Sequence, residues 1–168
     1  MKRIASIMLI GIGFVLYFAA AGWIYFNNLI THPTAISLPD QIAGLQIADY
    51  KTGAQAVADF TDLHGKQFPI ASSAIGVYGD AQITIWAASA PFDFITSRMV
   101  DAMREGITEE NSPFTPIEQF NEGKRTIYVL EGMGQKHFYF QSKNLIIWLA
   151  AVPSIADEAL KQILEAYP

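Results

Sequence analysis

Few side chains in this sequence could do chemistry, and none of them falls in a recognised catalytic or metal-binding pattern. The three histidines, His32, His64 and His137, are far apart in the chain, and there is no cysteine. Zinc and haem sites that can be recognised from sequence have ligands at short, defined spacing, such as HExxH or CxxCH. A metal site here would have to be assembled from distant residues, for instance His137 with acidic partners. We therefore expect no metal and no other cofactor.

Nucleophilic catalysis has no sequence support either, because the chain contains no GxSxG, no SxxK and no cysteine nucleophile. Asp101 and Glu105 are four residues apart on the polar side of a predicted helix, where contact with solvent explains them. Gly132 and Gly134 precede a predicted strand, so we interpret them as a hairpin turn and not as a phosphate-binding loop. The sequence thus favours a protein that is not an enzyme.

The element on which the rest of the chain depends is residues 4–30, which contain no charged side chain. At about 1.5 Å of rise per residue, roughly twenty apolar residues cross the hydrocarbon core of a bilayer, so this stretch is long enough to be a transmembrane anchor. Lys2 and Arg3 precede it and favour a cytoplasmic N-terminus by the positive-inside rule. We expect an inner-membrane (cell-membrane) protein whose C-terminal domain is periplasmic or extracellular.

A cleaved secretory signal is the alternative for the same stretch. Lys2 and Arg3 would form its basic region, residues 4–18 its apolar region and residues 19–21 its cleavage site. The hydrophobicity, however, continues beyond residue 21, and Trp23 and Tyr25 fall where an aromatic belt would meet the outer headgroups. We favour the uncleaved anchor.

Small residues form stripes along the predicted anchor. Gly13 and Ala20 are seven residues apart, and Gly11 and Gly22 are eleven apart. On a helix with 3.6 residues per turn, each pair falls on one face, where another helix can approach closely. These four positions are candidate contacts with other subunits of a membrane complex, although the GxxxG spacing itself is absent.

The remainder of the chain divides into a linker at residues 31–40, which contains Pro33 and Pro39, and one domain at residues 41–168. All sixteen acidic residues lie beyond residue 30, against nine Lys and Arg. This acidic balance argues against binding to nucleic acid or to anionic lipid through electrostatics. Without cysteine the domain cannot form disulfides, so its stability must come from its hydrophobic core.

Hydrophobic periodicity predicts an α+β domain with an antiparallel sheet and about three helices. The helices are expected at residues 54–63, 92–107 and from 153 onward, and strands at residues 73–78, 82–88, 125–131, 135–141 and 144–152. Residues 42–50 are an expected first strand or extended lead-in. The polar residues 108–123, broken by Pro113 and Pro116, are expected to form a surface loop with a short strand near 117–120.

An internal similarity links residues 83–91 with residues 145–153: each has a Trp five residues before a Pro and a predicted helix after it. It indicates two related strand-strand-helix (ββα) units, with the helices gathered on one face of the sheet. If the other face is uncovered, Trp86 or Trp148 with Tyr139 would form a flat apolar patch for another protein or a ligand. Phe114, between two prolines in the expected loop, is a further candidate anchor for a partner.

Three functions remain open. The one we favour is a non-catalytic accessory or scaffolding subunit of a bacterial membrane complex, bound through the lipid-embedded residues 4–30. Its layout is similar to that of single-span subunits in bacterial respiratory and photosynthetic electron-transfer assemblies such as alternative complex III, but no residue motif carries this comparison. The alternatives are a tethered binding module for a small ligand or envelope component, and a tethered hydrolase.

Overall fold

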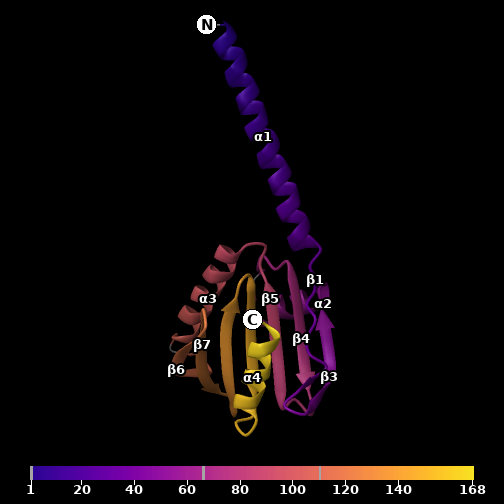
Figure 1. Ribbon diagram of the computed structural model, residues 1–168, viewed down its shortest axis with the longest axis vertical. Coiled ribbons are helices and arrows are strands. Elements are labelled where there is room, and N and C mark those ends of the chain that lie inside the picture. Colours follow the sequence, from indigo (N-terminus) through magenta and orange to yellow (C-terminus); the bar gives the residue numbers. More distant parts are fainter. Residues whose placement is uncertain (1, 66, 110) are drawn as a thin grey trace.

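The computed structural model describes residues 2–65, 67–109 and 111–168, and it shows a long helix that projects from a compact domain (Figure 1). The helix, α1 (Lys2–Thr31), has thirty residues and is therefore about 45 Å long. It is apolar enough to cross a membrane, and none of its most apolar window is buried against the described residues. This agrees with the helix expected at residues 4–30.

Within the described residues the chain forms four helices and one sheet of nine strands. The strand order along the sheet is β2-β3-β4-β5-β9-β8-β7-β6, and β1 pairs with β4. The elements that follow α1 are β1 (Thr34–Ala35), β2 (Gln41–Ile42), β3 (Leu45–Thr52), α2 (Ala54–His64), β4 (Ser72–Tyr78), β5 (Ile83–Ser89), α3 (Asp93–Ile107), β6 (Phe114–Glu122), β7 (Arg125–Gly132), β8 (Gln135–Ser142), β9 (Leu145–Ala151) and α4 (Ala156–Ala166).

Tight turns join most neighbouring strands and make their pairing antiparallel. In the β7–β8 turn, Met133 and Gly134 both have positive φ, at 51° and 76°. Two successive positive φ values are typical of a type I′ turn, whose twist matches that of the strands it joins. The two-residue β1 is the exception among the described strands, since it pairs parallel with β4. The predicted α+β class with an antiparallel sheet is therefore confirmed.

The two faces of the sheet are covered by different helices. The last helix, α4, packs with Phe138, Phe140, Ile147 and Leu149 into the larger core. α3 packs on residues of the opposite face, which include Tyr139 and Ile146. The expectation that the helices gather on one face was therefore wrong. The physical reason is the composition of β9, which is apolar at every position, so both of its faces need cover.

The internal similarity corresponds to a direct pairing. β5 and β9 are antiparallel neighbours, and Trp86 lies opposite Trp148. The two ββα segments are thus adjacent in the sheet, but their helices, α3 and α4, lie on opposite faces. Within the described residues, each segment is an antiparallel pair of strands followed by a helix. The two segments differ in the face of the sheet on which that helix packs.

Two parts of the expected layout differ in detail. The segment expected as a surface loop contains β6, a nine-residue strand paired with β7. Residues 31–40 are held against the domain: the Tyr167 hydroxyl donates to Ser37 O at 2.6 Å, the Tyr78 hydroxyl donates to Pro39 O at 2.8 Å, and Leu38 is buried. α1 therefore passes into the domain through an anchored segment.

Candidate functional site

A row of contacting aromatic rings crosses strands β6 to β9 beneath α3. Its members are the side chains of Phe114, His137, Trp148, Tyr139 and Tyr128, which we call the aromatic row. Ring centroids are 4.9 Å apart for Phe114 and His137, 5.4 Å for Trp148 and Tyr139, and 4.7 Å for Tyr128 and Tyr139. Cross-strand aromatic pairs of this kind stabilise a sheet and hold its side chains in a fixed arrangement.

His137 is the residue of this row best able to transfer a proton or to bind a metal. Both of its ring nitrogens, however, are already hydrogen-bonded. Its Nε2 lies 3.0 Å from Gly132 O, and its Nδ1 lies 3.2 Å from the indole nitrogen of Trp148. A carbonyl can only accept and an indole N–H can only donate, so Nε2 carries the proton and Nδ1 accepts. The side chain is buried, and this burial lowers the pKa of His137 below its usual value of 6.5.

This arrangement gives His137 a structural role in the neutral state. Neither ring nitrogen keeps a free lone pair, which a metal ligand or a general base would need. Among the described residues, no group of three or more His, Asp or Glu side chains is placed to hold a metal ion. The geometry found here does not support the hypothetical metal site built on His137.

We expect the buried imidazole to make the domain less stable in acid. Because the native pKa is lowered, the unfolded chain binds a proton first as pH falls below about 6.5, and the free energy of unfolding decreases until the native pKa is reached. Replacing His137 with Gln should remove this contribution to the dependence of the free energy of unfolding on pH. Urea unfolding of the full-length protein in detergent between pH 7.5 and 5 measures it. An unchanged slope in the His137→Gln variant would contradict the assignment.

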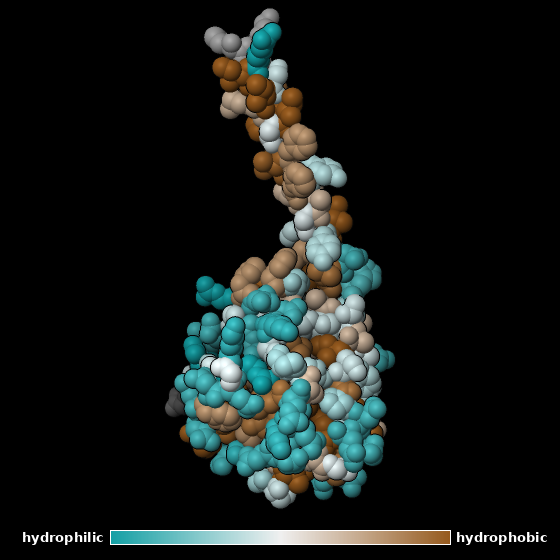
Figure 2. Space-filling model, in the orientation of Figure 1, coloured by the Kyte–Doolittle hydropathy of each residue, from teal (hydrophilic) through white to brown (hydrophobic). Residues whose placement is uncertain are grey.

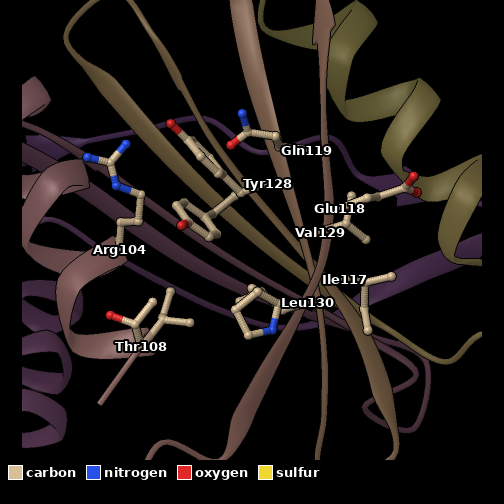
Figure 3. Close-up of a pocket in the computed structure, with 11 residues that line it drawn as sticks. Arg104, Thr108, Ile117, Glu118, Gln119, Tyr128, Val129 and Leu130 are labelled. Atoms are coloured by element: carbon tan, nitrogen blue, oxygen red, sulfur yellow. The ribbon is translucent and has the colours of Figure 1, made fainter.

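Beside the aromatic row, a hollow of about 320 Å³ lies between the end of α3 and strands β6 and β7. Figure 3 shows Arg104 and Thr108 on the α3 side, facing Tyr128 and Leu130, with Ile117 on the opposite wall. Burial raises the pKa of the nearby Tyr139 to about 12, so its hydroxyl stays protonated at neutral pH. The hollow can hold a small apolar group, with the Arg104 guanidinium at its rim.

Strand β6 forms one edge of the sheet, yet it is poorly suited to pair with another strand. Its ladder with β7 shifts register between Pro116 and Glu118, and almost all of its residues are exposed. A proline, a bulge and charged side chains on an edge are the devices by which natural sheets avoid pairing with other chains. We therefore do not assign β6 to a partner.

The candidate partner-binding residues from the sequence fall into two separate groups. Gly11, Gly13, Ala20 and Gly22 lie along α1, where their surroundings are open: a Cβ added at any of the three glycines would meet no described atom within 4 Å. Trp86, Trp148 and Phe114 lie in the domain, on the α3 side of the sheet. The structure brings the last two into ring contact at 5.1 Å.

The placement of Phe114 corrects one expectation. It begins β6 and is only partly exposed, with its ring against His137 and Trp148, so it does not protrude from a solvated loop. Trp86 and Trp148 are also partly buried, and Tyr139, expected to extend their patch, lies buried beneath α3. Partner binding at these three candidate residues remains a prediction.

Sequence reasoning missed an aromatic stack where α1 meets the domain. Phe26 of α1 stacks on Phe92 with centroids 6.4 Å apart, and Phe92 stacks on Phe94 at 5.7 Å. The sequence pattern predicts only that Phe92 begins the helix expected at residues 92–107. The available signal was the Pro-Phe-Asp-Phe sequence at residues 91–94, which places two aromatic residues at a helix start.

Comparisons of this chain with models of known protein families, with curated proteins and with solved structures find no match.

Proposed function

We propose that this protein is a non-catalytic, single-pass accessory or scaffolding subunit of a bacterial membrane protein complex. In this proposal α1 crosses the cell membrane with its N-terminus in the cytoplasm, and the α+β domain stands on the periplasmic or extracellular side. Its partners are other membrane subunits and the bilayer itself. An electron-transfer complex of the alternative complex III type is the narrower form of this proposal, and it rests on layout alone.

The main support for the proposal is that no other described part of the chain covers the apolar stretch of α1. The helix extends about 45 Å, and its most apolar window has no surface buried against the described residues. A bare apolar helix of this length needs a nonaqueous environment, which a bilayer and neighbouring helices provide. In the described part of the domain, by contrast, α3 and α4 cover the two faces of the sheet.

The positions of the small residues favour contacts between helices. At about 100° per residue, Gly11 and Gly22 lie on one face of α1, while Gly13 and Ala20 lie on nearly the opposite face. Between helices in lipid, attraction comes mainly from close packing, which small residues permit. α1 is therefore suited to lie between two neighbouring helices, as a subunit inside an assembly does.

A tethered binding module is the second candidate, and the hollow beside α3 favours it. Tyr128, Leu130 and Ile117 give it an apolar lining, and Arg104 lies at its rim. Arg104 also contacts Asp101 at 3.3 Å, and both side chains are about half exposed. A hollow of about 320 Å³ is at the lower end of ligand pockets, so it suits a fragment-sized ligand.

The proposal is tested by purification of the full-length protein, tagged at its C-terminus, from native membranes in a mild detergent. We expect partners at stoichiometric yield. A variant with Gly11, Gly13 and Gly22 replaced by Leu should lose them, because the added side chains separate the packed helices. The matched control replaces Ala19 and Ala21 with Leu, since these small residues lie on the faces between the two stripes.

A solitary protein would contradict the accessory-subunit function. Equal partner loss in the Leu variant and in the control would contradict the assignment of the stripes. In the first case, the soluble fragment from Ser37 onward becomes the material for ligand screens against the hollow.

A further inference from the structure

The end of the domain next to α1 exposes two aromatic side chains that belong to no core cluster of the described residues. Phe92 is 45% exposed and Phe94 is 67% exposed. They flank Asp93 at the start of α3, and Figure 2 shows apolar side chains at this end of the domain, beside the base of the helix. Exposed apolar side chains that lie together on a surface can mark a contact with a protein or a membrane.

The ring stack fixes this pair relative to α1. Phe26, Phe92 and Phe94 are stacked in a row with interplanar angles of 9° and 10°. The connecting chain is also held to the domain, because Thr34 N donates to Ala71 O at 2.9 Å and the carbonyls of Ser37 and Pro39 accept hydrogen bonds from tyrosine hydroxyls. The depth of α1 in a bilayer therefore determines the depth of Phe92 and Phe94.

That depth follows from the length of the helix. Residues 4–23 make up about 30 Å of helix, which is the thickness of the hydrocarbon core. Trp23 and Tyr25, both exposed on α1, are residue types that settle at the headgroup level. Phe26 lies three residues, or about 4.5 Å, beyond Trp23, and so it falls within the headgroup layer.

We propose that Phe92 and Phe94 form a shallow membrane-contacting wedge that inserts into the headgroup region of the same bilayer that α1 crosses. This inference rests on the proposed function, since it requires α1 to span the membrane. The occupant of the surface is lipid, because the stack holds both rings at the level where lipid headgroups surround the helix. Asp93 lies between these two residues in the sequence and is exposed, and a charged side chain at this place keeps the wedge at the headgroup level.

The wedge gives the domain a second attachment to the membrane. A single helix leaves a domain free to tilt and rotate about the membrane normal. Contacts at α1 and at Phe92 and Phe94 together fix its tilt, and so fix which surfaces of the domain face neighbouring subunits. The domain is acidic, so it gains no electrostatic attraction to anionic lipids. An attachment through apolar Phe side chains does not need that attraction.

The absence of cysteine from the sequence permits a direct test with single introduced cysteines. Full-length Leu9→Cys, Phe94→Cys and Met133→Cys variants are each labelled with a nitroxide and reconstituted into phosphatidylcholine vesicles. Met133 is 73% exposed and lies in the β7–β8 turn, at the opposite end of the sheet from the start of α3, so it is the matched aqueous control for Phe94. Collision with oxygen and with a water-soluble nickel chelate reports the depth of each label.

We expect the Phe94→Cys label to collide severalfold less with the nickel chelate than the Met133→Cys label, and to resemble a headgroup-level position. The Leu9→Cys label should be fully shielded. Equal chelate access at Phe94 and Met133, with Leu9 shielded, would overturn the wedge and leave the anchor intact. Chelate access at Leu9 would overturn the anchor itself. Matching tryptophan emission from the three variants confirms that each has the same fold.

Discussion

Replacement of Phe140 by Ala is expected to lower the free energy of unfolding of the domain by about 3–5 kcal/mol. Phe140 is fully buried in the larger core, between the sheet and α4, and the Arg125 guanidinium lies 5.8 Å above its ring. The substitution removes the apolar contacts and leaves a cavity that the neighbouring strands cannot close. Since whole domains are stabilised by about 5–15 kcal/mol, this is a large share of the total.

Urea unfolding of the full-length protein in detergent, followed by tryptophan fluorescence, measures this change, because Trp86 and Trp148 both lie in the sheet. Phe94→Ala is the matched control, since it removes the same side chain from an exposed position. The control should change the free energy of unfolding by no more than about 0.5 kcal/mol. A small effect of Phe140→Ala, or an equal effect of the two variants, would contradict the core described here.

Gly132→Ala is expected to destabilise the domain by about 1–3 kcal/mol, although it adds a single methyl group. A Cβ at this position would lie 2.6 Å from Pro113 O and 2.8 Å from Cδ1 of Phe114. The backbone carbonyl cannot rotate away as a side chain could, so the start of β6 must move. That movement would also shift the Phe114 ring, which contacts Trp148.

The control for this substitution is Gly106→Ala, which should have the opposite sign. Gly106 lies inside α3, and a Cβ there would meet no described atom within 4 Å. Because Gly106 is in the last turn of α3, its replacement by Ala should stabilise the protein by somewhat less than the roughly 0.5–1 kcal/mol typical of a helix interior. The same urea titration compares the two, and the change in Trp148 emission should accompany Gly132→Ala alone. Equal signs for the two substitutions would contradict the close approach of β6 to Gly132.

The parts of the fold that sequence predicted were those with strong local patterns. The uncharged residues 4–30 predicted α1, and the apolar residues 145–151 predicted a strand. Glycine-containing turns located the hairpins, because positive φ at Gly134 and Gly79 is a local requirement. These features depend on a few consecutive residues, and so they can be read without tertiary information.

The parts that sequence missed depend on contacts between distant residues. Pro116 and the polar residues of β6 suit a loop, and the strand exists because β7 provides its partner. The apolar residues of β9 require cover on both faces, but no local pattern shows which helix covers which face. The stack of Phe26 on Phe92 joins residues 66 positions apart, and the bonds of His137 to Gly132 and Trp148 depend on strand register.

We propose that α1 contacts other membrane proteins through its small-residue faces, and site-specific photocrosslinking in native membranes can detect such contacts. A photoreactive phenylalanine analogue replaces Phe18, which flanks the Gly11 and Gly22 face, or Ile12, which lies midway between the two stripes on the other side of the helix. We expect a discrete protein adduct from Phe18 and much less from Ile12. Lipid adducts alone from both positions, or equal protein adducts from both, would contradict the proposal.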